Sequence, residues 1–193
     1  LMLALWTSHH IWHENITFAK LDDAELVASH IAENYPSVIF LISMIIIAAS
    51  IKSAQFPFSS WLPRAMEGPT TSSAVFYGSL SVHLGVFLLL RTHSYWESIF
   101  LIKIFIIFIG VCTAIIATLI ARVQSTVKTQ IAYASVAQIG LMFIEVAMGW
   151  HLLALIHFSG NAFMRTYQLL VSPSVLNYLV HHQFFHYVKP TQK

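Results

Sequence analysis

Charged residues are scarce in this sequence. Only 9% of the 193 residues are Asp, Glu, Lys or Arg, whereas 57% are hydrophobic. An ordinary soluble domain has roughly 25% charged residues, so this chain lacks the polar surface that keeps a protein in water. Its 10 basic residues are scattered singly, while recognition of nucleic-acid phosphates needs clustered Lys and Arg. The composition therefore predicts a membrane protein without a nucleic-acid partner.

The sequence also has a single cysteine and none of the common motifs of soluble enzymes. Cys112 lies inside an apolar run, which excludes a disulfide framework and a Cys-rich metal site. GxSxG, P-loop, GxGxxG and HExxH patterns are all absent. Histidines cluster at 9–13 and 181–186, where we expect solvated side chains rather than metal ligands. We therefore predict no catalytic residue, no metal and no cofactor in this chain.

Long apolar stretches, in contrast, are frequent. A helix needs about 20 largely apolar residues to cross roughly 30 Å of hydrocarbon. Five stretches reach or approach this length, and we expect an all-α membrane protein with about five transmembrane helices. They cover residues 37–54, 72–90, 98–121, 131–149 and 150–171.

This pattern divides the chain into three regions. Residues 1–35 are expected to hold the end of a preceding helix and an acidic extracytoplasmic loop. Residues 36–171 form the transmembrane bundle, and residues 172–193 form an amphipathic tail that is too polar to span. Basic residues in 122–130 place that loop in the cytoplasm by the positive-inside rule. We expect a multi-pass membrane protein, and its expected location is the bacterial cytoplasmic (inner) membrane.

Lys52 follows a long run without charge and precedes Pro57 and Pro63. Proline lacks a backbone donor and clashes with the preceding turn, so the helix is predicted to break just after Lys52. The lysine then has two interpretations. It either extends to the membrane interface from a helix end, or it lines a polar cavity at a discontinuous helix, as in ion transporters.

Three polar residues recur at intervals of four on the last apolar stretch: His157, Asn161 and Arg165. This spacing places them on one face of a helix. Ionisable groups at membrane depth cost on the order of 2.5–3.5 kcal/mol each, so the face is expected to line a hydrophilic interior path. Arginine does not deprotonate in proteins, so Arg165 can set the field along a proton path but cannot carry the proton.

Other polar groups within the apolar stretches have less decisive positions. Tyr77 and His83 are six residues apart, about 120° around a helix, so they need not share a face, and each also suits a hydrogen-bonded packing role. Glu145 is either an interfacial carboxylate or a buried partner of one of the cations named above. Gln138 is typical of a hydrogen bond between two helices.

Two long segments carry a resemblance to a known family. They are residues 52–70, KSAQFPFSSWLPRAMEGPT, and residues 128–140, KTQIAYASVAQIG, with a continuation through His157 to Arg165. Over residues 37–170 the chain resembles the antiporter-like, proton-translocating membrane subunits of respiratory complex I and of multisubunit cation/proton antiporters. Members of that family have about fourteen spanning helices, so the resemblance implies a partial bundle, helices seven to eleven, in a fragment, a split subunit or part of something larger.

The resemblance also implies roles for particular residues. Lys52 matches the central lysine of the discontinuous seventh helix, and His157 matches a relay histidine of the eleventh. Tyr77 stands where the respiratory subunits have His, and a second His and a Lys of the eleventh helix are replaced here. The expected proton relay is Lys52, His83, Glu145 and His157, and the expected supporting polar path is Tyr77, Lys128, Gln138, Asn161 and Arg165.

A narrower similarity involves residues 64–70, 74–91 and 165–174. These segments are similar to the membrane subunit of DAB-type inorganic-carbon accumulation complexes. This similarity implies that the subunit passes cations down their gradient while a large partner subunit, resembling a zinc-dependent carbonic anhydrase, hydrates CO2. Any zinc would then belong to the partner, and the tail from Ser172 would be the docking element.

The predicted function is therefore a proton-translocating membrane subunit that couples a cation gradient to a partner and so energises the accumulation of CO2 or bicarbonate. One alternative is an antiporter-like subunit of a respiratory NADH:quinone oxidoreductase or of an Mrp-type cation/proton antiporter. A second alternative is a non-conducting membrane scaffold whose buried charges only pair with each other. In each case the chain is expected to contact the lipid bilayer and to act as a subunit, without catalytic chemistry of its own.

Overall fold

The computed structural model describes residues 1–12, 23–75 and 81–185. Every regular element in these ranges is a helix, and no strand occurs in them, so the predicted all-α fold is confirmed. In chain order the helices are α1 (Met2–Trp12), α3 (Ala24–Glu33), α4 (Tyr35–Lys52), α5 (Trp61–Ala65), α6 (Thr70–Ser72), α7 (Leu84–Arg91), α8 (His93–Trp96), α9 (Phe100–Arg122), α10 (Val127–Ala147) and α11 (His151–Phe185).

Three of these helices are long and apolar enough to cross a membrane. They are α4, α9 and α10, with 18, 23 and 21 residues, and they match the predicted stretches 37–54, 98–121 and 131–149 to within a few residues at most ends. The outer face of α9 is apolar as well as exposed, which suits contact with lipid; it includes Phe100, Leu101, Phe108, Ile115 and Leu119. The chain is thus a membrane-embedded protein.

The two remaining apolar stretches fold less simply than a pair of single spans. Within 72–90, the described residues form the end of α6, π-helical turns at 73–75 and at Ser81, and then α7. A π turn contains an extra residue and shifts the helix faces that follow it. Helix α11 continues without a break past residue 171 to Phe185. Its continuity rests on backbone hydrogen bonds, which do not require the segment to stay apolar.

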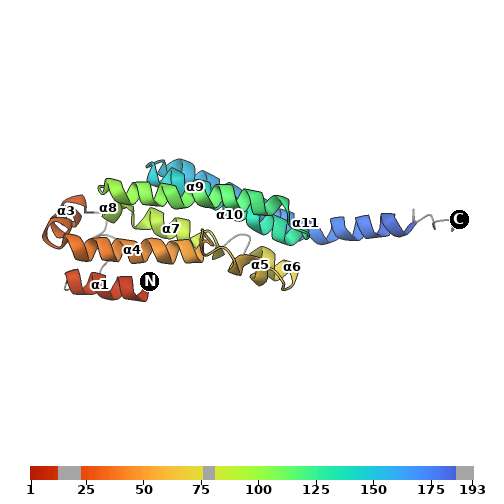
Figure 1. The fold of residues 1–193 in the computed structure, drawn as a ribbon, viewed down its shortest axis with the longest axis horizontal. Helices are drawn as coiled ribbons and strands as arrows, with labels where there is room; N and C mark the ends of the chain where they lie inside the picture. Colours follow the sequence, from red (N-terminus) through yellow and green to blue (C-terminus); the bar gives the residue numbers. More distant parts are fainter. Residues whose placement is uncertain (13–22, 76–80, 186–193) are drawn as a thin grey trace.

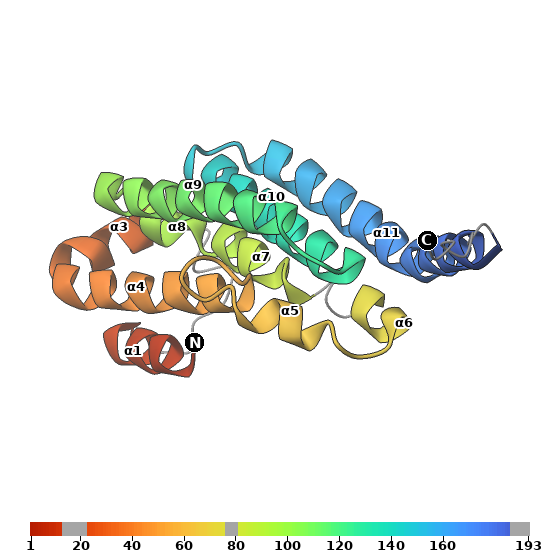
Figure 2. The ribbon, with the colours of Figure 1, turned by 45° about the vertical axis from the view of Figure 1, so that its right-hand side comes forward.

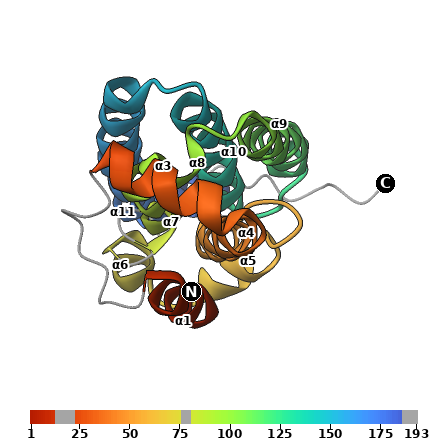
Figure 3. The same ribbon diagram turned by 90° about the vertical axis from the view of Figure 1, so that its left-hand side faces the viewer.

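The helices lie roughly along one long axis, and α11 extends beyond the end of the bundle (Figure 1). Seen along that axis, α7 occupies the middle, with α4, α10 and α11 around it and α9 on the far side of α10 (Figure 3). Helix α1 packs along α4. Helices α5 and α6 lie near the end at which α4 stops, whereas α3 and α8 lie near the opposite end (Figure 2).

The predicted break after Lys52 is present. Helix α4 ends there, and Ala54 adopts a positive φ of 52°. Side chains bond to the irregular backbone: Phe56 N donates to Thr113 Oγ1 of α9 at 3.0 Å. The Ser53 carbonyl accepts from Gln55 Nε2 at 3.0 Å, and the Ile51 carbonyl accepts from Trp61 Nε1 at 2.9 Å. Ser53 Oγ also donates to the Val82 carbonyl, just before α7, at 2.6 Å. Backbone groups freed by the break are therefore satisfied inside the protein, as the membrane interior requires.

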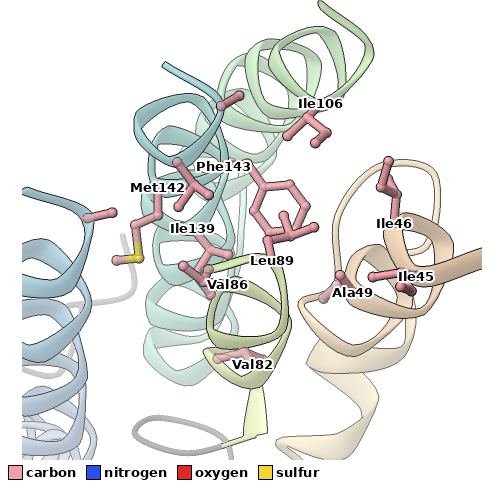
Figure 4. Packing of buried hydrophobic residues seen from close by; sticks show 14 of the residues in the cluster. Ile45, Ile46, Ala49, Val82, Val86, Leu89, Ile106, Ile139, Met142 and Phe143 are labelled. Atoms are coloured by element: carbon pink, nitrogen blue, oxygen red, sulfur yellow. The ribbon is translucent and has the colours of Figure 1, made fainter. Parts of the chain in front are cut away.

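The core brings together apolar side chains from α4, α7, α9 and α10 (Figure 4). Because lipid tails are as apolar as these side chains, association of the helices depends on close packing rather than on exclusion of water. The packed residues include Ile45, Ile46 and Ala49 of α4, Val86 and Leu89 of α7, Ile106 of α9, and Ile139, Met142 and Phe143 of α10.

Three glycines allow the closest approaches between helices. A Cβ at Gly110 of α9 would lie 2.6 Å from the Gly140 carbonyl oxygen, and a Cβ at Gly140 of α10 would lie 2.7 Å from the Gly110 carbonyl oxygen. A Cβ at Gly85 of α7 would collide with the Ala49 carbonyl and with Ser53 Oγ. The α9–α10 and α4–α7 contacts are therefore backbone to backbone, as in the small-residue interfaces of other membrane bundles.

We predict that Gly110→Ala destabilises the protein by about 1–3 kcal/mol, the usual cost of overpacking. The new methyl group must push α9 away from α10, because the obstructing atom is a backbone oxygen. Thermal unfolding in detergent measures the effect. Gly160→Ala of α11 is the matched control, because nothing lies within 4 Å of a Cβ built there. Equal unfolding temperatures for the two variants would contradict the proposed contact.

Candidate functional site

Several polar side chains of the bundle interior lie between α7, α10 and α11. On α11, His157, Asn161 and Arg165 share one face, as their spacing predicts, and each makes a hydrogen bond to α10 or to the residue that begins α7. Their contacts form two clusters, one around His157 and one around Arg165. We name these the His157 cluster (Gln138, Glu145, His157) and the Arg165 cluster (His83, Asn161, Arg165, Gln168).

In the His157 cluster the imidazole lies between two side chains of α10. His157 Nδ1 is 2.8 Å from Glu145 Oε1, and His157 Nε2 is 2.9 Å from Gln138 Oε1. The His157 side chain is 23% exposed and that of Glu145 is 15% exposed. Glu145 was expected to lie at the interface or to pair with Lys52 or Arg165, but it is largely buried and its hydrogen bond is to His157.

This geometry limits where the hydrogens of the cluster can lie. A neutral imidazole has one N–H and one lone pair, whereas an oxygen faces each ring nitrogen of His157. The arrangement fits the imidazolium, which donates from both nitrogens, with the Glu145 carboxylate as its counter-charge. A neutral His157 fits the same site once the Gln138 amide turns over and donates its own N–H to Nε2. The two arrangements of His157 therefore differ in the orientation of the Gln138 amide.

In the Arg165 cluster the guanidinium is held by three acceptors. Its Nη1 donates to Gln168 Oε1 at 2.7 Å, its Nη2 to the Ala134 carbonyl of α10 at 3.4 Å, and its Nε to Asn161 Oδ1 at 3.3 Å. Asn161 Nδ2 then lies 3.0 Å from His83 Nε2. His83 is 0% exposed and Asn161 is 8% exposed, so α7 and α11 are joined by a fully buried polar contact.

The two clusters are neighbours without a hydrogen bond between them in the part of the chain that the structure describes. His157 and Asn161 are one turn apart on α11. The Phe158 ring packs edge-on against His83, with ring centroids 5.0 Å apart. A proton that passes from one cluster to the other thus needs a bridging water or a movement of side chains.

Lys52 lies apart from both clusters. Its side chain is exposed at the end of α4, and it makes no hydrogen bond or ion pair with any described residue. Lys128 has a different contact from the polar path expected of it: its Nζ donates to the Gly68 carbonyl at 2.8 Å and approaches the Met66 carbonyl at 3.5 Å, and so holds the turn after α5 against α10. Tyr77 lies outside the described residues.

A further group of titratable side chains lies around α8, at the end of the bundle where α11 begins. The rings of His93 and His151 have centroids 4.7 Å apart, and His93 Nε2 is 3.9 Å from Glu97 Oε2. Nearby, burial raises the pKa of the Tyr95 hydroxyl above its ordinary value. Among the described residues no group of three or more His, Cys, Asp or Glu side chains is placed to hold a metal ion.

Sequence reasoning did not identify Gln168 or the Ala134 carbonyl as partners of Arg165. Gln168 follows Arg165 by three residues on a helix, a spacing that brings side chains together, so this contact could have been predicted from the sequence. The contact with the Ala134 carbonyl could not have been predicted, because a bond to a backbone acceptor on another helix depends on how the two helices pack.

Comparison with known proteins gives a family match over nearly the whole chain. The transmembrane family described as NADH:quinone oxidoreductase/Mrp antiporter matches residues 1–189. A curated relative, NADH-ubiquinone oxidoreductase chain 5 of Strongylocentrotus purpuratus, is 38% identical over 144 residues, which cover 75% of this chain and 23% of the relative. NADH-quinone oxidoreductase subunit L of Rhodobacter capsulatus is 32% identical over 170 residues, 88% of this chain and 24% of the relative.

A solved structure is similar as well. A chain of the Mrp complex from a Dietzia species superposes with a TM-score of 0.67 at 28% sequence identity, over 72% of this chain and 16% of that chain. This chain therefore spans about a quarter or less of the length of the relatives that it matches.

The contact between Glu145 and His157 predicts energetic coupling between the two residues. In a double-mutant cycle of Glu145→Gln and His157→Gln, we expect a coupling free energy of about 0.5–3 kcal/mol, because each single change leaves a partly buried charge or donor without its partner. Unfolding of the four proteins in detergent measures it. Glu97→Gln in place of Glu145→Gln is the control and should give no coupling, whereas equal coupling in both cycles would refute the pair.

Proposed function

Because this chain belongs to the NADH:quinone oxidoreductase/Mrp antiporter transmembrane family, we propose that it forms part of a proton-translocating membrane subunit of the complex I or Mrp type. The relatives named above are subunits of such complexes by name. The chain matches only about a quarter of their length, so the activity, the substrate ion and the partner subunits all belong to the proposal.

One observation supports this function above the others: titratable groups lie hydrogen-bonded between α7, α10 and α11 inside an apolar bundle. Ionisable residues at membrane depth are costly, and they are concentrated along ion and proton pathways. A scaffold gains nothing from them, since apolar packing of the same volume is often at least as stable as a buried ion pair. The arrangement favours a conducting role.

Each of these side chains is assigned a role in the proposed proton path that its chemistry permits. His157 and Glu145 exchange a proton, because the cluster fits both protonation states of the imidazole. His83 offers a second buried imidazole at the start of α7. Arg165 remains charged throughout and fixes a positive potential within the Arg165 cluster. Lys52, which extends from the broken helix α4 toward the outside of this chain, relays protons to or from a neighbouring part of the complex.

The narrower function, coupling to CO2 or bicarbonate accumulation, also remains a proposal. The segments 64–70, 74–91 and 165–174 support it by resemblance, while the three relatives named above are respiratory and Mrp subunits. Copurified partners separate the two: a soluble zinc-containing subunit supports inorganic-carbon uptake, and flavin or iron–sulfur subunits support a dehydrogenase. The bacterial cytoplasmic membrane is the location that we propose with either partner.

We predict that Lys52→Ala abolishes proton flux driven by a pH gradient. The experiment uses the protein with the subunits that copurify with it, reconstituted into liposomes that contain a pH-sensitive dye. Flux through Lys52→Ala is expected to fall to the level of empty liposomes, because the relay loses its ammonium at the helix break. Lys103→Ala on α9 is the matched control and should conduct like the parent.

Two results would count against the proposal. If Lys52→Ala conducts as well as the parent, the lysine has no relay role. If the parent itself shows no flux in a complex with all of its copurifying subunits, the non-conducting scaffold is the better description.

A further inference from the structure

Arg165 presents only hydrogen-bond donors. Its guanidinium carries five N–H groups, has no acceptor and keeps its proton in proteins. Three acceptors on two helices fix its position: Gln168 Oε1, the Ala134 carbonyl and Asn161 Oδ1. The carbonyl of Ala134 accepts only, so the guanidinium is anchored to the backbone of α10 as well as to its own helix.

This fixed donor determines how the Asn161 amide is oriented. The amide has one oxygen, which accepts, and one NH2 group, which donates. With the oxygen on Arg165 Nε at 3.3 Å, the nitrogen must face the other way, and it lies 3.0 Å from His83 Nε2. Turning the amide over would set its NH2 against the guanidinium, donor against donor.

The amide orientation in turn decides which nitrogen of His83 holds the proton. Asn161 Nδ2 donates, so His83 Nε2 must accept with its lone pair. A neutral His83 in this position therefore carries its proton on Nδ1. We infer that Arg165 is a positioning residue that, acting through Asn161, holds buried His83 as the neutral Nδ1–H tautomer with Nε2 unavailable for a proton.

The other imidazole is not restrained in this way. Among the described contacts of Gln138, its amide bonds to His157, and no guanidinium donates to its oxygen as Arg165 does to that of Asn161. Gln138 is half-buried and borders a groove of about 360 Å³ between α9 and α10, which leaves the amide room to turn. His157, with Glu145 on its other nitrogen, can thus change its protonation state while His83 is held in one.

In the proposed path, Arg165 would therefore control whether His83 can exchange a proton on its α11 side. As long as Arg165 holds Asn161, a proton can neither enter nor leave His83 from the α11 side. Loss of the 3.3 Å contact frees the amide and opens that side. This consequence rests on the proposed function, but the tautomer itself does not, because it follows from hydrogen-bond geometry alone.

The test is nitrogen NMR of the 15N-histidine-labelled protein in lipid bilayers, which separates the two neutral tautomers and the imidazolium by their chemical shifts. The His83 signals are identified by their loss in His83→Gln. In the parent we expect a protonated Nδ1 and an unprotonated Nε2. In Arg165→Met the ratio of the two tautomers should shift by roughly tenfold or more toward Nε2–H, the effect of one hydrogen bond to a charged group.

A second variant is expected to favour the opposite tautomer of His83. Asn161→Asp supplies only acceptors, so it should place a proton on His83 Nε2, the reverse of the parent. Thr166→Val is the control on the same helix, since the Thr166 hydroxyl bonds only to the Ala162 carbonyl among its described contacts and should leave the His83 spectrum unchanged.

Two outcomes overturn the inference: a parent in which His83 Nε2 is protonated, or an Arg165→Met spectrum identical to that of the parent, because Arg165 then does not set the tautomer. No change in Asn161→Asp would likewise contradict the role of Asn161. Flux is measured on the same samples. Absence of flux in the parent together with the expected spectra would remove the proposed function and leave the tautomer assignment standing, so the two failures are distinguishable.

Discussion

The hydrocarbon around a membrane bundle offers no water for hydrogen bonds, so a buried polar group must find its partners within the protein. Two features of the structure follow from this constraint. Backbone groups freed at the break after Lys52 are satisfied by the side chains of Thr113, Gln55 and Trp61. The guanidinium of Arg165 is satisfied by two side chains and a carbonyl. Because the partners are few and fixed, a group that can only donate forces its neighbour to accept, and this in turn determines the role of the neighbour's other partner.

The two amides show how the same side-chain chemistry gives opposite behaviour. Asn161 lies between an arginine and an imidazole, and Gln138 borders an imidazole and an open groove. The first amide has one acceptable orientation and the second has two. Their difference comes from the neighbours and not from the residue type, and it separates a fixed element of the proposed path from one that exchanges protons.

Much of this architecture could be predicted from the sequence because it depends on local patterns. The apolar length of α4, α9 and α10, the proline signal after Lys52 and the spacing of four on α11 each correspond to what the structure shows. What could not be predicted depends on how helices pack. Glu145 had several possible partners until α10 and α11 were placed side by side, and the π-helical turns before α7 have no simple sequence signature. The continuation of α11 past residue 171 was missed because polarity, rather than the backbone, was used to set its end.

The mutual contact of Gly110 and Gly140 has a mechanical consequence. Two backbones in contact cannot slide past each other without a collision, so α9 and α10 behave as a single stiff wall. Helix α11, in contrast, is attached to that wall near the site through the side chains of His157 and Arg165, whose rotamers can change. Any relative movement of these three helices is therefore expected to be a shear of α11 over a stationary α9–α10 pair.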